Sequence, residues 1–208
     1  MTDPGGRLSL QPLPGLTVWP GRLDGEAQAR LLADVRRRIE QAPFYRPVTP
    51  GGREMSVRMT NFGPLGWVTD QADGYRYQPT HPATGAPWPD IPRILLELWR
   101  EHADPGRPPD ACLVNLYRGD ARMGLHQDRD ETDLTAPVLS VSLGDTGVFR
   151  FAPEKGGRSG SIRLSSGDVL VMAGPARLCR HGIDRVLAGS SRLLADGGRL
   201  NLTLRRAG

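Results

Sequence analysis

The stretch GRLNLTLRRA, residues 198–207, has the alternation of a β-strand, and its two faces differ sharply in chemistry. Side chains alternate across a strand, so one face holds only leucines: Leu200, Leu202 and Leu204. The opposite face holds polar groups: Arg199, Asn201, Thr203 and Arg205. If the leucines pack against a helix, both arginines lie on an inner surface, where unpaired charge is costly and an anionic partner is required. The alternative is a half-exposed strand with both arginines in water.

A second stretch, ACLVNLY at 111–117, alternates in the same way. Asn115 and Tyr117 share one face with Leu113, and an amide and a phenol facing one interior could donate hydrogen bonds to a carboxylate. A core tyrosine with a satisfied hydroxyl is the alternative for Tyr117.

Further short strands, separated by turns, favour a sandwich or barrel over alternating β-α units. The predicted strands are 111–117, 136–143, 147–152, 160–164, 168–173, 181–187 and 198–206. An amphipathic helix is predicted over 25–41, where an apolar stripe faces away from the arginines, and a second helix runs from a cap at Asp90 through Trp99. The fold class is therefore α+β, with helices bracing a β-barrel-like core.

The chain length suits one domain with a sizeable core. Residues 1–15, rich in Gly and Pro, are predicted to be a flexible N-terminal arm, and 16–208 to be a single domain with its β-core at 111–208. The loop-rich segment 44–89 is too long to be structureless inside a compact domain unless it is functional, so a substrate lid with short strands is expected there.

Composition sets weaker limits. The net charge is +4 and Lys155 is the only lysine, so arginine dominates and a phosphate-bearing partner is compatible. Cys112 and Cys179 lack a metal or redox spacing, and buried free thiols are expected. Neither a signal peptide nor a membrane-spanning run is visible, so we expect a cytoplasmic protein with no membrane association. No apolar helix stripe is left over, which favours a monomer without an obligate protein partner.

The stretch GLHQDRDETD, residues 124–133, is either a solvated loop or a set of metal ligands. His126 and Asp128 are two residues apart and on an extended segment can converge on one metal. Two histidines and one carboxylate form the facial triad of non-haem Fe(II) oxygenases. His181 begins a predicted strand and is a better third ligand than His81 in a Pro-rich loop or His102 at a helix end.

One small molecule could account for both the predicted metal ligands and the arginines of 198–207. A metal with an open face and arginines in need of an anion are both satisfied by a small dicarboxylate that chelates iron at one end. 2-Oxoglutarate is that molecule, and its distal carboxylate would meet a guanidinium, preferably through two hydrogen bonds. A position near the substrate would remain for O2.

Several stretches resemble the AlkB family of Fe(II)- and 2-oxoglutarate-dependent nucleic-acid dealkylases, over roughly Pro43 to Gly208. They are VTPGGREMSVRMTNFGPLGWVT, DACLVNLYRGDARMGLHQDRDE, APVLSVSLGDTGVFRF, RHGI and RLNLTLRRAG. The resemblance implies a double-stranded β-helix (jelly-roll) core with flanking helices and a nucleotide-recognition lid at 44–89. It also implies the oxidative demethylation of N-alkylated bases such as 1-methyladenine and 3-methylcytosine in single-stranded DNA, with RNA as a second candidate. Succinate, CO2 and formaldehyde would be released.

The resemblance also assigns roles to residues. His126, Asp128 and His181 would hold Fe(II) as the catalytic metal ligands. Arg199, assisted by Tyr117, would pair with the distal carboxylate of 2-oxoglutarate. The surroundings of its iron-chelating end would be formed by Asn115, Asn201 and Arg205.

The implied substrate contacts lie mainly in the lid. A flipped base must be held between flat surfaces, and these would be Trp67 and the ring of His126. Phosphate contacts would come from Tyr75, Arg76, Tyr77 and Arg122. Asp130 corresponds to an acidic residue near the base edge and could favour cationic methylated bases; a solvated charge is the alternative.

Departures from the family pattern bear on individual positions. Met172 stands close to the metal where an aromatic residue is usual, and Arg180 precedes His181 where an aromatic is typical. Arg122 replaces a lysine, which keeps the charge and changes the geometry. Leu200 and Leu204 replace aromatics that point outward, so only packing should differ. The competing functions are an oxygenase of proteins or small molecules with the same chemistry, and a non-catalytic nucleic-acid-binding barrel.

Overall fold

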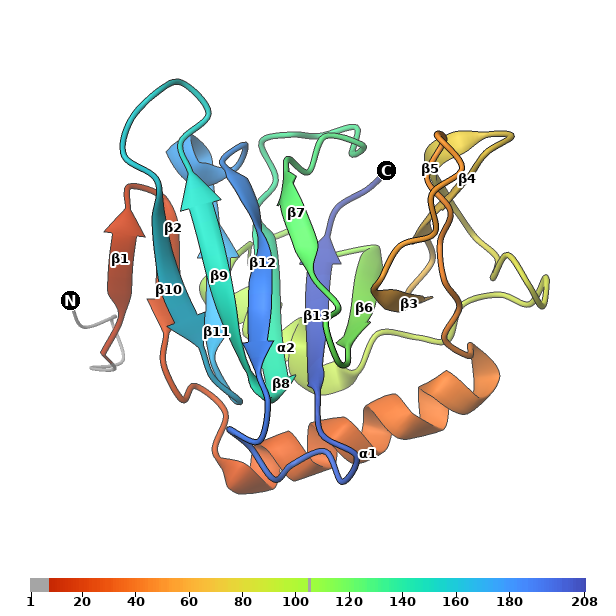
Figure 1. The fold of residues 1–208 in the computed structure, drawn as a ribbon, viewed down its shortest axis with the longest axis horizontal. Coiled ribbons are helices and arrows are strands. Elements are labelled where there is room, and N and C mark those ends of the chain that lie inside the picture. The colour runs from red at the N-terminus through yellow and green to blue at the C-terminus, as the bar shows by residue number, and fades with distance from the viewer. Residues whose placement is uncertain (1–7, 105) are drawn as a thin grey trace.

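The computed structural model describes residues 8–104 and 106–208, and two β-sheets form its core (Figure 1). The larger sheet has the strand order β1-β2-β11-β8-β13-β6-β3. Its strands are β1 (Leu10–Leu13), β2 (Leu16–Trp19), β3 (Arg58–Phe62), β6 (Ala111–Tyr117), β8 (Val138–Gly144), β11 (Val169–Met172) and β13 (Arg199–Arg205). The smaller sheet, in the order β10-β9-β12-β7, has the strands β10 (Gly160–Leu164), β9 (Thr146–Ala152), β12 (Arg180–Leu187) and β7 (Met123–His126). Its antiparallel pairings are those of a double-stranded β-helix, as predicted.

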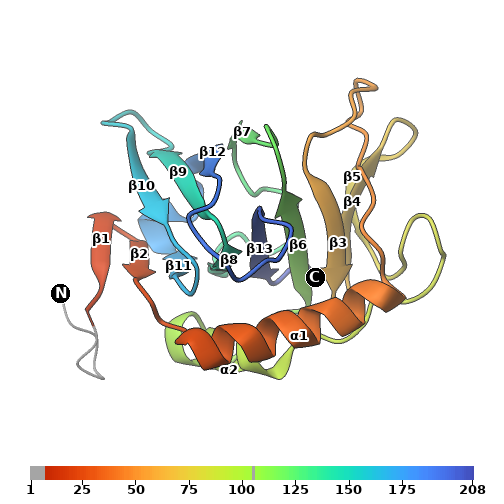
Figure 2. The ribbon, with the colours of Figure 1, turned by 60° about the horizontal axis from the view of Figure 1, so that its bottom comes forward.

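Two helices cover the outer face of the larger sheet (Figure 2). The helix α1 (Gly25–Gln41) begins at Asp24, whose side chain accepts a hydrogen bond from the amide of Ala27 at 2.8 Å. The second helix is α2 (Arg93–His102). The leucines of β13 belong to the same buried cluster as Leu31 of α1 and Trp99 of α2, which confirms that the leucine face of this strand packs against helices.

The inner face of the larger sheet turns polar in the middle. The strand β13 lies between β8 and β6, and its register places Arg199 opposite Tyr117 and Asn201 opposite Asn115. Residues directly opposite each other share one face of a sheet, so these four side chains form one inner group. A second apolar cluster, which includes Phe149 of β9, fills the rest of the space between the sheets.

A hairpin of β4 (Gly66–Asp70) and β5 (Gly74–Gln78) stands beside the core, on the right of Figure 1. It lies within the segment 44–89 that is predicted to be a lid. The strand β3 lies in the same segment but pairs with β6 in the larger sheet. The whole segment is therefore not a lid, because the residues from Met59 to Phe62 are buried and form part of the core.

Two other predictions about elements are corrected. The flexible arm predicted over 1–15 contains β1, which pairs with β2 because the backbone of 10–13 finds a partner strand; residues 1–7 lie outside the described residues. Asp90 does not cap α2, whose N-cap is Pro92 with no side-chain hydrogen bond. The strands β2 and β7 were not among the predicted strands. In the described part of the chain, no helix has the length and apolar character needed to span a membrane.

Candidate active site

A cavity of about 420 Å³ lies between the two sheets and beneath the β4–β5 hairpin. Both sheets and the hairpin contribute to its wall. The lining includes Trp67, Tyr75, Asn115, Tyr117, His126, Asp128, Asp130, Met172, His181, Asn201 and Arg205. Most of the predicted site residues therefore meet in one place although they are far apart in the sequence.

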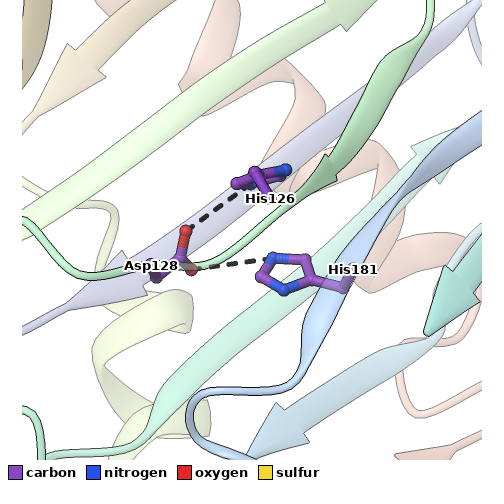
Figure 3. A group of neighbouring side chains, drawn as sticks. All are labelled: His126, Asp128 and His181. Carbon is purple, nitrogen blue, oxygen red and sulfur yellow. Dashed lines mark ion pairs between the residues drawn. The ribbon is translucent and has the colours of Figure 1, made fainter. Parts of the chain in front are cut away.

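Three of these residues, called here the metal-ligand group, lie close enough together that they could hold a metal ion (Figure 3). His126 at the end of β7 and His181 near the start of β12 are opposite each other in register, and Asp128 follows in the loop after β7. The Nε2 atoms of the two histidines lie 3.6 and 3.7 Å from the two carboxylate oxygens of Asp128. One ligand atom from each residue lies within 4.8 Å of the others, as one ion would require.

Hydrogen bonds at Nδ1 orient both imidazoles. The Nδ1 atom of His126 lies 3.0 Å from the carbonyl oxygen of Gly124, and that of His181 lies 3.1 Å from the carbonyl oxygen of Cys179. A carbonyl only accepts, so Nδ1–H donates in each case, and Nε2, which lies near Asp128, is left as the atom that could bind a metal. Burial lowers the pKa of His181 to about 4, which keeps this ring neutral and able to bind a metal.

Asp128 is a buried carboxylate with one oxygen left over. Burial alone would raise its pKa, but Arg205, His181 and His126 together hold the pKa well below its usual range. Arg205 Nη2 lies 2.9 Å from Oδ1 of Asp128, whereas the buried Oδ2 has no hydrogen-bond partner in the part of the chain that the structure describes. An ionised carboxylate with an unused oxygen, beside two oriented imidazoles, fits a divalent metal such as Fe(II).

Arg199 fits an anionic co-substrate. Its side chain is fully buried, and burial lowers its pKa. Its Nη2 donates to Ser142 at 2.9 Å and to Asn201 at 2.5 Å, while the buried Nε and Nη1 find no hydrogen-bond partner in residues 8–104 and 106–208. Among the described residues it forms no ion pair, and its guanidinium lies 5.5 Å from the ring centre of Tyr117. A buried cation with two unused donors fits a carboxylate, the group that 2-oxoglutarate would place there.

The remaining predicted co-substrate residues differ in whether their polar atoms already have hydrogen-bond or ion-pair partners. Asn201 forms hydrogen bonds with Arg199, Ser140 and Thr203, whereas the buried Oδ1 of Asn115 has no partner among the described residues. Arg205 pairs with Asp128 and with Oε1 of Glu131 at 3.2 Å. The two arginines of β13 are thus unequal, because one is already paired and the other is not.

The hairpin residues form a small aromatic and acidic group at the cavity. The indole Nε1 of Trp67 donates to Asp130 at 2.7 Å, and the indole ring stacks on Tyr75 with 5.6 Å between ring centres. Tyr75 is about half exposed. The two surfaces predicted to hold a base, Trp67 and the His126 ring, both line the cavity.

The other predicted phosphate contacts lie farther from the cavity wall. Arg76 pairs with Asp70 at 2.8 Å, within the hairpin, and Arg122 is an exposed residue just before β7. The hydroxyl of Tyr77 donates to Glu131 at 2.7 Å and accepts from Arg205 at 3.1 Å. Burial raises the pKa of Tyr77, so this hydroxyl stays protonated.

Two buried residues of this region were missed in the sequence. Glu131 and Arg177 form an ion pair of 3.1 Å in which both side chains are almost fully buried. Arg177 had no signal in its local sequence, whereas Glu131 stands in the quoted acidic run.

Two of the residues that depart from the family pattern lie in different surroundings. Met172 is buried on the cavity wall with its sulfur 3.7 Å from Sγ of Cys179, whereas Arg180 is exposed. Both cysteines are buried and free, as predicted.

The class of protein follows from this fold and site. Residues 15–205 match the family model described as the 2OG-Fe(II) oxygenase superfamily. The chain is thus an Fe(II)- and 2-oxoglutarate-dependent dioxygenase.

Similarity to individual proteins shows which family within this superfamily the chain belongs to. An "Alpha-ketoglutarate-dependent dioxygenase AlkB homolog" of Caulobacter vibrioides is 58% identical, over 94% of this chain and 89% of the relative. The "Alpha-ketoglutarate-dependent dioxygenase AlkB" of Escherichia coli is 43% identical, over 95% and 93%. The solved structure of OsALKBH1 is 30% identical with a TM-score of 0.78, over 96% of this chain and 100% of that one. The chain belongs to the AlkB family.

Proposed function

We propose that this dioxygenase removes methyl groups from N-alkylated bases, of the 1-methyladenine and 3-methylcytosine type, in single-stranded DNA. The observation that carries the proposal is that one cavity brings together the His126–Asp128–His181 ligand group and the aromatic lid residue Trp67. Membership of the AlkB family supports nucleic acid as the substrate class. RNA is proposed as a second substrate, and DNA repair in the cytoplasm as the biological setting.

The proposed roles follow the chemistry of each side chain. His126, Asp128 and His181 would hold Fe(II), which with O2 and 2-oxoglutarate supplies the oxidation of the methyl carbon. The distal carboxylate of the co-substrate would accept hydrogen bonds from Arg199, with Tyr117 beside it. Asn115 and Asn201 would surround the opposite end of this molecule. Arg205 would act there through its ion pair with Asp128.

The lid residues would hold and select the base. A base that is taken out of its stack can be held between Trp67 and the ring of His126. Asp130 would lie near the base edge, fixed by its hydrogen bond from Trp67, and its charge would favour the cationic ring that N-alkylation creates. The exposed Tyr75 and Arg122 would contact phosphates together with Arg76, whereas the hydroxyl of Tyr77 would anchor the lid.

Single strands are the proposed preference because an unpaired base is cheaper to extrude than a paired one. A monomer without an obligate protein partner is also proposed.

The proposal is tested by mass spectrometry of a single-stranded oligonucleotide that carries one 1-methyladenine. The oligonucleotide is incubated with the protein, Fe(II), 2-oxoglutarate and air, beside a His126→Ala sample. We expect the wild type alone to remove the methyl group and release succinate. Succinate without demethylation would contradict the proposed substrate, and the absence of both products would contradict catalysis.

Substitution of Trp67 should weaken nucleic-acid binding more than chemistry. Because stacking of one base on an aromatic ring contributes about 1–3 kcal/mol, Trp67→Ala should raise KM for the methylated oligonucleotide by about 5- to 150-fold. Steady-state demethylation kinetics measure this change. A larger loss in kcat than in kcat/KM would contradict a binding role for Trp67.

Asp130→Asn tests the charge beside the base. This change keeps an acceptor for the Trp67 indole and removes the negative charge. We expect kcat/KM to fall for cationic 1-methyladenine and to stay nearly constant for a methylated base that is uncharged, such as 1-methylguanine. Competition between two oligonucleotides in one reaction gives the ratio directly, and an equal loss for both bases would refute charge selection.

A further inference from the structure

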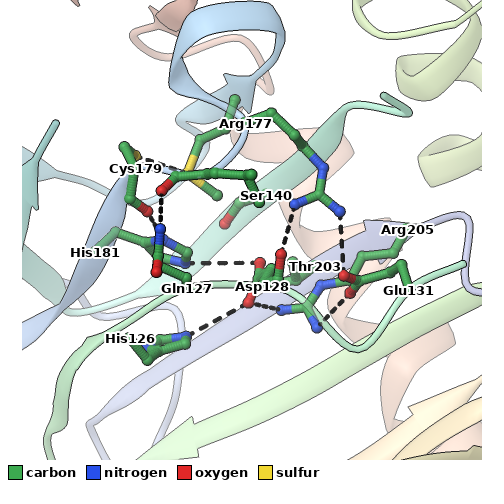
Figure 4. Close-up of polar contacts among 12 residues, drawn as sticks. His126, Gln127, Asp128, Glu131, Ser140, Arg177, Cys179, His181, Thr203 and Arg205 are labelled. Carbon is green, nitrogen blue, oxygen red and sulfur yellow. Dashed lines mark hydrogen bonds and ion pairs between the residues drawn. The ribbon is translucent and has the colours of Figure 1, made fainter. Parts of the chain in front are cut away.

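Three consecutive residues before β12 contact either a member of the metal-ligand group or Gln127, which lies between two of its members. Arg177 Nη1 donates to the carbonyl oxygen of Asp128 at 2.9 Å, and the carbonyl oxygen of Leu178 accepts from the side chain of Gln127 at 2.5 Å. The carbonyl oxygen of Cys179 accepts from Nδ1 of His181, as described above. One short segment therefore holds two of the three ligands and the residue between His126 and Asp128 (Figure 4).

Arg177 also joins the two ends of the loop 127–137, which connects β7 to β8. In addition to its bond to Asp128, its Nε donates to the carbonyl oxygen of Ala136 at 2.6 Å. Its Nη2 lies 3.1 Å from Oε2 of Glu131, in the middle of the same loop. A planar guanidinium can satisfy acceptors in several fixed directions at once, which an ammonium group cannot do.

Glu131 lies between Arg177 and Arg205 and balances their charge. One carboxylate oxygen faces Arg177 at 3.1 Å, and the other faces Arg205 at 3.2 Å. Arg205 in turn pairs with the side chain of Asp128, so this residue is held at its carbonyl by one arginine and at its carboxylate by the other. Two buried carboxylates thus offset two buried guanidinium groups directly behind the ligand group (Figure 4).

We propose that Arg177 and Glu131 are positioning residues for the metal, which hold Asp128 in its ligating position without contacting the ion. This inference rests on the metal assignment in the proposed function. It does not depend on the nucleic-acid substrate, because the contacts that carry it join the loop 127–137 to Arg177 and Arg205.

The direction in which replacement of Arg177 changes the metal affinity distinguishes a positioning role from a purely electrostatic one. Removing a positive charge near a cation site should strengthen cation binding through space alone. If Arg177 acts by holding Asp128, its replacement should weaken metal binding instead. Arg177→Lys keeps the charge and loses the planar fork, so only the positioning role predicts a loss in this variant.

The experiment measures Co(II) binding to the metal-free chain. Co(II) gives visible absorption bands whose energy and intensity report the ligand geometry, and titration gives Kd. Wild type is compared with Arg177→Lys, Arg177→Met and Glu131→Gln. The matched control is Arg107→Met, which removes an arginine that pairs with Asp133 of the same loop on the exposed side. Near-UV circular dichroism is used to choose a temperature at which every metal-free variant is folded.

We expect each of the three variants to raise Kd by about 10- to 100-fold, with altered absorption bands, because outer partners of metal ligands have effects of this size. The control should keep both Kd and spectrum. Wild-type Kd and spectrum in Arg177→Lys and Glu131→Gln would overturn the inference, as would tighter binding by Arg177→Met. Failure of the wild type to bind Co(II) would instead overturn the metal assignment on which the inference rests.

Discussion

Replacement of Asp128 by asparagine is expected to abolish both metal binding and demethylation. The change keeps the shape of the side chain and an acceptor for Arg205, but it removes the only carboxylate of the ligand group. The two histidines would then have to hold the ion beside two guanidinium groups, Arg205 and Arg177, that share one carboxylate, Glu131, and the excess positive charge repels the ion. Loss of an outer partner costs about 10- to 100-fold in metal affinity, so loss of this ligand should cost more than about 100-fold.

Co(II) or Mn(II) titration and oligonucleotide mass spectrometry check this expectation on the same sample. Asp133→Asn is the matched control, because Asp133 is an acidic residue of the same loop that pairs with Arg107 outside the cavity. We expect the control to retain both properties. Wild-type metal affinity in Asp128→Asn would remove Asp128 from the ligand group.

Replacement of Arg199 by methionine is expected to have opposite effects on co-substrate binding and on stability. Arg199 is fully buried with two donors unused, so it is the group on which a carboxylate would bind. Breaking a buried charge pair costs about 3–5 kcal/mol, and the Kd for 2-oxoglutarate should therefore rise by about 150-fold or more. In the absence of 2-oxoglutarate, the same change removes an unpaired buried charge and should leave the free energy of unfolding unchanged or increased.

Calorimetric titration of 2-oxoglutarate into the Mn(II)-loaded protein measures the first effect. Chemical unfolding without metal or co-substrate measures the second. Arg150→Met, on the exposed side of β9, serves as the control and should alter neither quantity strongly. A strongly destabilised Arg199→Met chain, with unchanged affinity for 2-oxoglutarate, would show that Arg199 is a structural cation.

The strand β13 shows what a single sequence can predict. Its alternation indicated which residues face the helices and which face inward, and both faces are as predicted. The difference between its two arginines could not be predicted from the alternation. Arg205 is neutralised by Asp128 and Glu131, which lie 77 and 74 positions away, whereas Arg199 meets neither. The period of the apolar residues predicts which way each side chain of a strand points. Its ion-pair partners depend on tertiary contacts that the period does not contain.

The lid illustrates the same limit. The length of 44–89 and its aromatic residues indicated a functional segment, but β3 was indistinguishable from the rest because a short strand has little periodicity. The hydrogen bond from Trp67 to Asp130 joins residues 63 positions apart and leaves no local pattern. Arg177 was missed for this reason too, since a buried arginine has no signature without its acceptors.

The position of β7 gives the ligand group a mechanical consequence. This strand is the last in the smaller sheet, and among the described residues it pairs with one strand only, β12. It carries His126, while Arg205 of the larger sheet grips Asp128. An ion held by these ligands would therefore link this edge strand to β12 in its own sheet and, through Asp128 and Arg205, to the larger sheet. Loss of the iron would then make this part of the cavity wall more mobile and would also abolish catalysis.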